Sequence, residues 1–242
     1  MTPTSNSIIG ELVAQDYRFA TVFQQNKIDF CCQGNRTIEE ACAKKKVDVD
    51  ALIGELNKAA ASGDASSTDF NSWSLDLLAT YIEKKHHRYV EKRITEIKPM
   101  LAKIVKVHGD LHPELMEVEE LFLGSAGELT AHMKKEEFIL FPFVKKLVQA
   151  SEDKTELTPG HFGTVANPVA MMMDEHEAEG ERFRKIAELT NDYTPPLGAC
   201  TTYMVTFSLL KEFEQDLHLH IHLENNILFP KAIELEKSLV YA

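Results

Sequence analysis

Apolar residues recur at intervals of three or four along most of the chain, which is the spacing of one face of an α-helix. The most regular series lies near the middle of the sequence. It consists of Leu115, Val118, Phe122, Ser125, Leu129, His132, Glu136, Ile139, Phe143 and Leu147. We find no convincing alternation of apolar and polar residues of the kind that marks a strand. The pattern therefore predicts an all-α protein.

Four long amphipathic helices are predicted after residue 73. The first covers about 74–107, although Pro99 is expected to kink it or to end it early. The three that follow cover about 113–147, 168–189 and 203–227. Four such helices joined by shorter connections predict a four-helix bundle.

The N-terminal part of the chain has shorter helical patterns with a break between them. The break is the segment KIDFCCQGNRT, in which Gly34 and Asn35 favour a turn. Helix resumes after Thr37, a predicted N-cap whose capping box is completed by Glu40. Residues 61–72 are small and polar, which is typical of a linker. The predicted division is a small helical domain at 1–62, a linker at 63–73 and the bundle at 74–242.

One phrase, H-x-x-x-E-x-x-I-L-F-P, occurs twice: as HMKKEEFILFP from His132 and as HIHLENNILFP from His220. In each copy the histidine and the glutamate, Glu136 or Glu224, lie one turn apart on the apolar face of a helix. An ionised glutamate that faces a core is costly unless something neutralises it. The repeat therefore predicts a metal site inside the bundle.

Two more histidines lie on the apolar stripes of the first and third helices. They are His86 and His176, and each precedes one copy of the phrase by a similar interval, whereas His87 is expected about 100° around the helix from His86. Mixed imidazole and carboxylate ligation favours iron or manganese over a structural zinc. We predict two irons, each with two histidines, bridged by the two glutamates. The predicted ligands are His86, His132, Glu136, His176, His220 and Glu224.

Other interpretations of these histidines are open at this point. A single H-x-x-x-E is a weak signal, and the bland alternative is a set of solvated faces and hydrogen-bonded core histidines. A ferritin-like site would need two Glu-x-x-His motifs, of which only Glu83 with His86 is present. His218 and His222 form a separate helix face and are expected to be solvated.

Cys31 and Cys32 stand side by side in the FCCQGN segment. The spacing does not suit a zinc site, and a disulfide between neighbours would be strained. We name them as candidate catalytic residues, an exposed thiol pair that handles metal, nitric oxide or redox equivalents. The alternative is that they are small apolar fillers. Cys42 and Cys200 lie in helical patterns and are expected to be inert core residues.

Charge and composition exclude several classes of partner. Asp and Glu number 38 against 26 Lys and Arg, a net charge of −12, whereas nucleic acid requires a basic surface. The segment MTPTSNSIIGEL lacks the features of a signal peptide, and no run approaches the roughly 18 apolar residues of a membrane span. Four cysteines are too few for a disulfide framework. We expect a cytoplasmic protein with no nucleic-acid or membrane partner.

The motifs together resemble a known family. IDFCCQGNRTIEEAC looks like the short ScdA-type domain, whereas HMKKEEFILFP, DEHEAEGE and HIHLENNILFP are similar to hemerythrin-like domains. In this order they resemble the repair-of-iron-centres (RIC) family of YtfE/ScdA type. The resemblance implies a non-haem di-iron centre in the bundle and a role in restoring iron-sulfur clusters damaged by nitric oxide or oxidants. Cys31 and Cys32 match the cysteine pair of that family.

Three functional hypotheses follow. The first is an iron-donating repair protein that acts on damaged iron-sulfur proteins or on a cluster-assembly scaffold. The second is a sensor of nitric oxide or oxygen, or a small nitric oxide reductase, that uses the same ligands. True hemerythrins have five histidines, and one fewer protein ligand leaves coordination positions open for either role. The third is an acidic scaffold, which leaves the repeated phrase unexplained. The oligomeric state, a homodimer included, and the question of catalysis are open.

Overall fold

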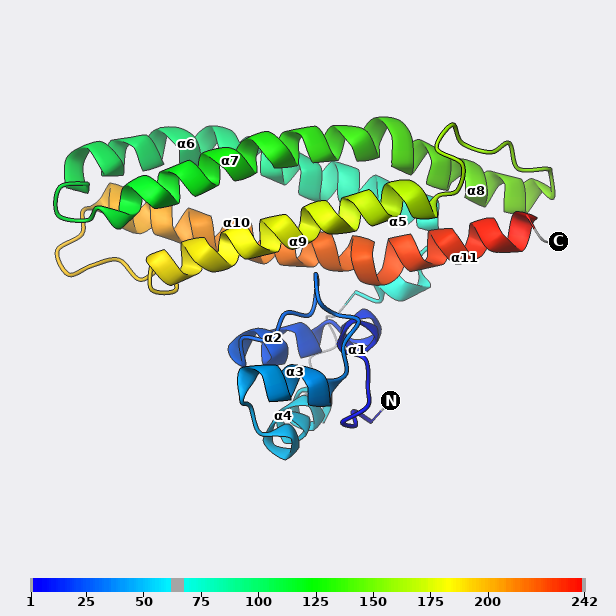
Figure 1. Cartoon of the computed structure of the whole chain (residues 1–242), viewed down its shortest axis with the longest axis horizontal. Coiled ribbons are helices and arrows are strands. Elements are labelled where there is room, and N and C mark those ends of the chain that lie inside the picture. The colour runs from blue at the N-terminus through cyan, green and yellow to red at the C-terminus, as the bar shows by residue number, and fades with distance from the viewer. Residues whose placement is uncertain (1, 62–67, 241–242) are drawn as a thin grey trace.

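The structure, a computed structural model, describes residues 2–61 and 68–240. Figure 1 shows a long bundle of helices with a small helical unit against one side. The prediction of an all-α protein is confirmed, because helices dominate both described ranges. The predicted boundary at residue 62 and the linker residues 63–67 lie outside the described residues.

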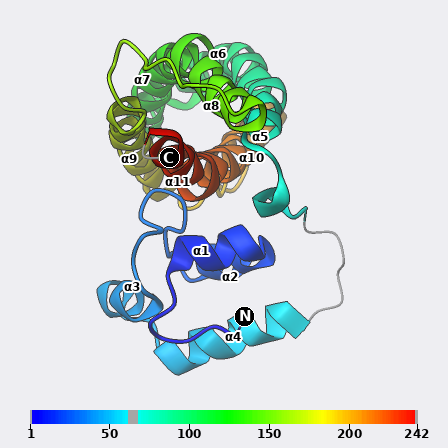
Figure 2. The ribbon, with the colours of Figure 1, turned by 90° about the vertical axis from the view of Figure 1, so that its right-hand side faces the viewer.

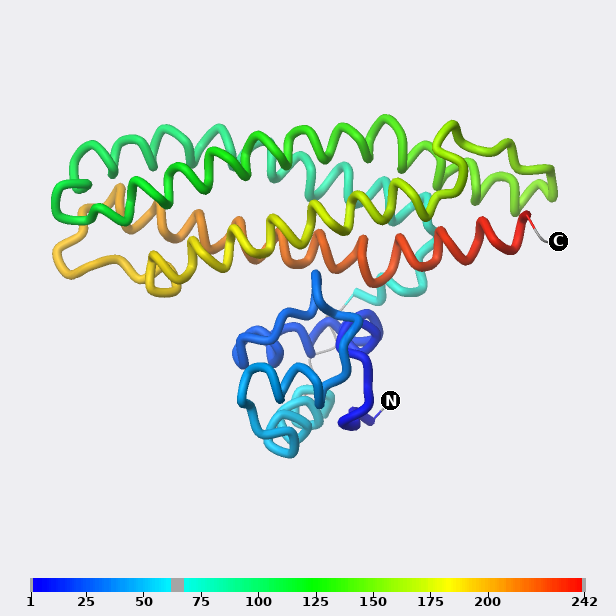
Figure 3. Tube along the Cα trace, in the orientation of Figure 1, coloured from blue at the N-terminus to red at the C-terminus, as the bar shows by residue number. Residues whose placement is uncertain are grey.

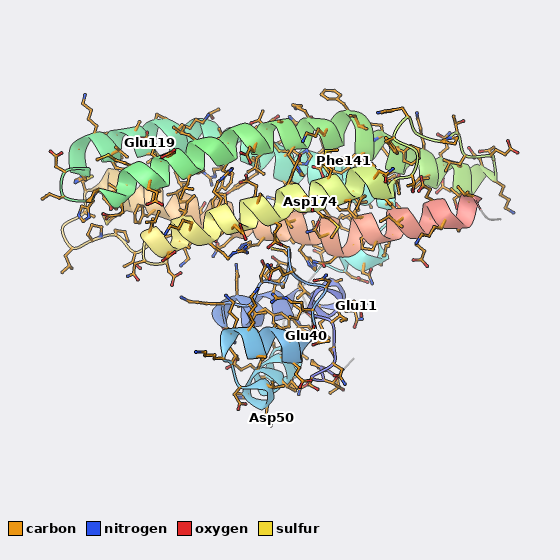
Figure 4. The ribbon with its side chains drawn as sticks, viewed as in Figure 1. Glu11, Glu40, Asp50, Glu119, Phe141 and Asp174 are labelled. Carbon is orange, nitrogen blue, oxygen red and sulfur yellow. The ribbon has the colours of Figure 1, made fainter. Side chains whose placement is uncertain are left out.

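The small unit contains four short helices. They are α1 (Ile9–Gln15), α2 (Arg18–Gln25), α3 (Ile38–Lys45) and α4 (Val49–Ala61). The predicted capping box at the start of α3 is confirmed: the Glu40 backbone N–H donates to Thr37 Oγ1, and Glu40 Oε2 accepts from the Thr37 N–H at 2.9 Å. Glu40 is labelled on this unit in Figure 4.

Four helical rods form the bundle and surround a common interior, as the end-on view of Figure 2 shows. Three of them contain a π-helical segment. The first rod is α5 (Leu75–Tyr81), η2 (Ile82–His87) and α6 (Arg88–His108); the second is α7 (Glu114–Lys135), η3 (Glu136–Leu140) and α8 (Phe141–Asp153); the third is α9 (Ala166–Leu189); and the fourth is α10 (Thr201–Leu223), η4 (Glu224–Leu228) and α11 (Phe229–Val240).

The first rod does not end at Pro99, so of the two outcomes expected from the sequence, a kink or an early end, the early end is wrong. Helix α6 continues through this residue to His108, and the tube in Figure 3 follows the rod without a break. Ile97 and Leu101 are both fully buried on either side of Pro99. Their packing outweighs the one backbone hydrogen bond that proline removes. No helix within the described ranges is long and apolar enough to span a membrane.

Two apolar clusters fill the interior of the protein. One contains residues of α6, α7, α9 and α10 together with the core of the small unit, including Phe23 and Phe30. The other contains residues of α5, α8, α11 and the beginning of α9, including Leu78 and Phe229. Buried histidines and glutamates lie between the two clusters. The small unit therefore shares a core with one half of the bundle.

Candidate metal centre

Six buried side chains converge in the middle of the bundle as two overlapping groups. His132 and His176 form one group with Glu136 and Glu224, and His87 and His220 form a second group with the same two glutamates. Within each group the nearest ligand atoms all lie within 4.8 Å of one another. Both glutamates are completely buried. Each half of the centre thus has two imidazoles, and the two carboxylates are shared.

One residue of the predicted ligand set does not converge with the others, because His87 takes the place expected for His86. His87 Nε2 lies 3.3 Å from Glu136 Oε2, whereas His86 belongs to neither group. A regular α-helix would place His86 on the face of Ile82, four residues earlier. Residues Ile82–His87 instead form a π-helical turn, whose wider i to i+5 spacing aligns His87 with Ile82.

His86 is nevertheless buried next to the centre. Its Nδ1 lies 3.1 Å from Asp216 Oδ2, and its ring stacks on that of His220 with centroids 5.5 Å apart. On the other side of the centre Phe141, labelled in Figure 4, stacks on His87 at 5.6 Å. These flat contacts restrict the rotation of two of the four converging imidazoles.

Three of the four imidazoles are oriented by an outer hydrogen-bond partner. His132 Nδ1 lies 2.8 Å from Glu175 Oε2, His176 Nδ1 lies 2.8 Å from Asn225 Oδ1, and His87 Nδ1 lies 3.0 Å from Glu137 Oε1. Carboxylate and amide oxygens only accept, so each Nδ1 carries a proton, and Nε2 is the nitrogen that each ring turns to the interior.

Sequence analysis missed these three partners, although a signal for them was available. Glu137 and Asn225 each follow a predicted glutamate ligand, and Glu175 immediately precedes His176. Each of these partners lies next to a converging residue on its own helix, and its side chain reaches the imidazole of a neighbouring rod. That imidazole needs a hydrogen-bond acceptor for its Nδ1 proton.

The converging atoms fit a metal ion better than a hydrogen-bond network. His132 Nε2 and His176 Nε2 face each other at 3.0 Å, although both rings already carry their proton on Nδ1. Among the described residues, His87 Nε2 and both oxygens of Glu136 find no hydrogen-bond partner. Acceptor atoms brought this close together are expected where they point at a common cation. Left unpaired, such buried groups would be costly.

The electrostatics of the centre also favour positive charge. Burial by itself would lower the pKa of His132, but Glu136 and Glu175 raise it to about 10. The pKa of Glu224, despite the opposing effect of burial, is held well below its ordinary value by His220 and His176. The field that retains a proton on His132 equally attracts a metal cation.

A cavity of about 200 Å³ adjoins the half that contains His132 and His176. Its lining includes Glu175, Glu179 and Lys135. Lys135 pairs with Glu175, and the nearly buried Glu179 accepts a hydrogen bond from Ser125 at 2.6 Å. The cavity brings space for small ligands to one side of the centre.

The cysteine pair is less exposed than predicted. Cys31 is buried and Cys32 is partly exposed, with their sulfur atoms 3.8 Å apart as free thiols. Asp29 Oδ1 accepts from both backbone N–H groups, and the Cys32 thiol lies 3.3 Å from the His176 carbonyl oxygen. Cys32 and burial together raise the pKa of Cys31 well above its ordinary value. The pair therefore lies against the helix that carries one imidazole of the centre.

The two remaining cysteines differ from each other. Cys42 is buried, as predicted, but Cys200 is exposed at the N-cap of α10, so the prediction of a core residue is wrong there. Cys200 is the residue at which the chain turns into α10 at the end of the bundle. The buried apolar stripe of α10 begins only after this cap, so the Cys200 side chain does not reach the core.

Comparisons with known proteins agree with this arrangement. Residues 5–60 match the family model ScdA_N, described as a domain of unknown function, and residues 78–232 match the hemerythrin HHE cation binding domain. The iron-sulfur cluster repair protein YtfE of Yersinia pseudotuberculosis is 34% identical over 238 residues, which cover 96% of this chain and 98% of that protein. The iron-sulfur cluster repair protein ScdA of Staphylococcus haemolyticus is 31% identical over 228 residues, 94% and 98% of the two chains. The chain belongs to the YtfE/ScdA family.

In this member of the YtfE/ScdA family, the converging histidines and glutamates all lie within the matched cation-binding domain. The cysteine pair lies within the ScdA_N match. The description of the hemerythrin family model names a cation binding domain, and the buried oxygen and nitrogen atoms of the bundle are suited to hold a cation.

Two histidines predicted to be solvated instead contact the ScdA_N unit of this YtfE/ScdA chain. His222 is almost fully buried and lies 5.8 Å from the rings of both Tyr17 and Phe30. His218 Nδ1 lies 3.2 Å from the side-chain nitrogen of Gln24. The prediction was wrong because their face turns away from the bundle interior, and the small unit covers it.

Proposed function

We propose that this protein holds two iron ions in the bundle and supplies iron to clusters damaged by nitrosative or oxidative stress. The partner is a damaged iron-sulfur protein or a cluster-assembly scaffold. A cytoplasmic location, expected from the sequence, belongs to the same proposal. The names of the YtfE and ScdA relatives support the assignment to cluster repair.

The observation that carries the proposal is the pair of buried groups that share two glutamates. Four imidazoles and two carboxylates are a donor set typical of iron or manganese, and the absence of thiolates in the groups argues against structural zinc. His132 and His176 would hold one ion and His87 and His220 the other, with Glu136 and Glu224 shared between them. Iron bound there supplies both the redox chemistry and the metal to be delivered.

The residues of the centre are suited both to holding metal ions and to releasing them. Glu175, Glu137 and Asn225 keep three imidazoles in the tautomer that offers Nε2 to a metal. The carboxylates lower the cost of holding cations among apolar side chains. Six protein ligands for two ions leave coordination positions open, which favours exchange over permanent storage.

The first test is the metal content of protein purified without oxygen. We expect two irons per chain in the parent and a large loss in the His132→Ala, His220→Ala double variant. The control is His161→Ala, which changes an exposed histidine outside both groups. A metal content that the double variant does not change, or a single zinc in the parent, would contradict the proposed centre.

The repair step needs its own experiment. A purified iron-sulfur enzyme is inactivated with nitric oxide and then incubated with iron-loaded parent, with the metal-poor double variant, or with free ferrous iron at equal concentration. We expect the parent to restore more activity than either comparison. Equal recovery with the double variant would refute iron donation.

A second candidate function is the binding of nitric oxide or oxygen at the same centre. The cavity next to His132 and His176 favours it, because a diatomic ligand would have space on that side. The two functions differ in what nitric oxide does to the bound iron. Donation predicts release of iron to a chelator under nitric oxide, whereas sensing or reduction predicts a nitrosyl absorption spectrum with the iron retained.

A further inference from the structure

The cysteine loop, residues Asp29–Gly34, rests on the elements that carry one half of the metal centre. In Figures 1 and 2 the connection between α2 and α3 projects from the small unit onto the bundle. Besides the ring contacts of Phe30 with α10, its polar contacts with the bundle go to α9 and η4. They are the hydrogen bonds of Gln33 with Glu177, of Phe30 with Asn226 and of Cys31 with Asn225, the thiol contact of Cys32 with His176, and the ion pair of Asp29 with Arg184.

A single buried amide connects this loop to an imidazole of the centre. Asn225 Oδ1 accepts from His176 Nδ1 at 2.8 Å, while Asn225 Nδ2 donates to the Cys31 carbonyl oxygen at 3.3 Å. The second bond fixes which way the amide faces. The orientation of the His176 ring therefore depends on a hydrogen bond that ends on the cysteine loop.

The loop also contacts the backbone of the same histidine. The Cys32 thiol donates to the His176 carbonyl oxygen at 3.3 Å. Gly180, one turn further along α9, makes room for this contact, because a Cβ atom there would lie 3.0 Å from Cys32 Sγ. His176 is thus held at its ring by Asn225, which is bonded to Cys31, and at its backbone directly by Cys32.

The other half of the centre has no such connection among the described residues. His87 Nδ1 donates to Glu137, whose carboxylate pairs with Arg88 and Lys134 of the bundle itself. Glu137 and Asn225 occupy corresponding positions, each directly after a shared glutamate. Both copies of the repeated phrase therefore supply an acceptor for an imidazole. Only Asn225, in the half with His176, is also hydrogen-bonded to the small unit.

We propose that seating of the cysteine loop positions His176, so that the half of the centre formed by His132 and His176 retains metal only while the loop is docked. The inference rests on the proposed function, since it concerns the same metal centre. Coupling of this kind is reciprocal, so metal bound at His176 must also hold the loop in place and shield Cys32.

The experiment measures that shielding directly in the full chain. In a Cys200→Ser background, which removes the exposed thiol, iodoacetamide alkylates Cys32 with loss of iodide, and tandem mass spectrometry assigns the modified sulfur. We expect alkylation of Cys32 to be at least about fivefold slower in protein loaded with ferrous iron than in metal-free protein. Equal rates with and without iron would overturn the proposal.

Three variants separate coupling from general loss of structure. Asn225→Asp keeps the acceptor for His176 but loses the donor to Cys31, so we expect the protection of Cys32 to disappear and one of the two irons to reach a chelator faster than in the parent. Gly180→Ala touches no converging residue, favours helix, and displaces Cys32, so one of two irons should reach a chelator faster. Glu137→Gln weakens the other half and should leave the protection of Cys32 as in the parent.

Circular dichroism and the melting temperature establish that each variant is folded before its metal is measured. If Gly180→Ala releases iron at the parental rate, or if Glu137→Gln abolishes protection as Asn225→Asp does, positioning by the loop is refuted. A parent that holds two irons and repairs clusters without protecting Cys32 refutes this inference alone. A parent that binds no iron refutes the proposed function, and this inference with it.

Discussion

At the scale of single residues, the neighbours His86 and His87 have the same burial and different surroundings. Both are completely buried. His87 points at Glu136 and is anchored by Glu137, whereas His86 contacts Asp216 and covers the ring of His220. Burial alone therefore does not identify a metal ligand. The direction of the Nε2 lone pair does, and the outer hydrogen bond sets that direction.

Substituting these two histidines separately tests the corrected ligand. We expect His87→Ala to lose at least one of two irons, because half of the centre would retain only His220 as an imidazole. His86→Ala should retain both irons, since it removes a stacked ring and no converging atom. Iron per chain by elemental analysis decides between them. The opposite result would restore His86 as the ligand.

The buried carboxyl of Glu214 on α10 gives a separate prediction about how the stability of the fold depends on pH. Burial raises the pKa of this carboxyl to about 7 from an ordinary value of 4.5. The folded state therefore binds the proton more tightly, and its stability falls as the pH rises from about 4.5 to 7. We expect Glu214→Gln to be about 1–3 kcal/mol more stable than the parent at pH 8 and equally stable at pH 4, by urea unfolding. The exposed Glu234→Gln should follow the parent at both values.

At the scale of elements, the π-helical turn in the first rod explains how two regular stripes meet at the centre. Ile82 begins the turn on the buried face, and Val90, Ile94 and Ile97 continue that face beyond it. The continuation is displaced by one residue from what a regular helix would give. The π-helical turn accommodates one residue more than a regular helical turn. The apolar faces of α5 and α6 on either side of it therefore both face the core.

Deletion of single lysines tests this explanation. Lys85 is exposed within the π-helical turn, so its removal should leave a continuous α-helix with the same buried faces and change stability by no more than about 1 kcal/mol. Lys92 is exposed in regular helix, and its removal rotates one flank by about 100°, which we expect to cost more than about 3 kcal/mol. Urea unfolding measures both. Equal destabilisation would show that the turn has no such role.

At the scale of the whole molecule, the bundle encloses carboxylates whose negative charge its own side chains neutralise only in part. Glu136 and Glu224 are fully buried with unpartnered oxygen atoms among the described residues. The apolar clusters on either side must hold this polar layer in place. Any cation bound only by the folded state therefore stabilises the entire bundle.

We accordingly expect ferrous iron to raise the melting temperature of the parent. A free concentration one hundred times the dissociation constant adds about 2.7 kcal/mol per site, or roughly 5–10 °C for a domain of this size. Scanning calorimetry without oxygen, with and without a chelator, measures the shift. The His132→Ala, His220→Ala variant serves as the control, and an equal shift in that variant would show that iron binds elsewhere.

The sequence by itself determined the helical fold and five of the six converging residues. Periodicity reports which face of a helix is buried, and the phrase that begins at His132 and again at His220 places a histidine and a glutamate on that face twice. The capping box of Thr37 and Glu40 could be predicted because it joins two residues only three positions apart in the sequence.

Only the tertiary structure decided the choice of His87, the roles of Glu175 and Asn225, and the covering of His222 by the small unit. The π-helical turn is a departure from the regular period on which sequence analysis depends. The other contacts join residues from different rods or domains, and their geometry exists only after the helices have packed. Local pattern fixes the face that each residue occupies, and packing fixes which residue it meets there.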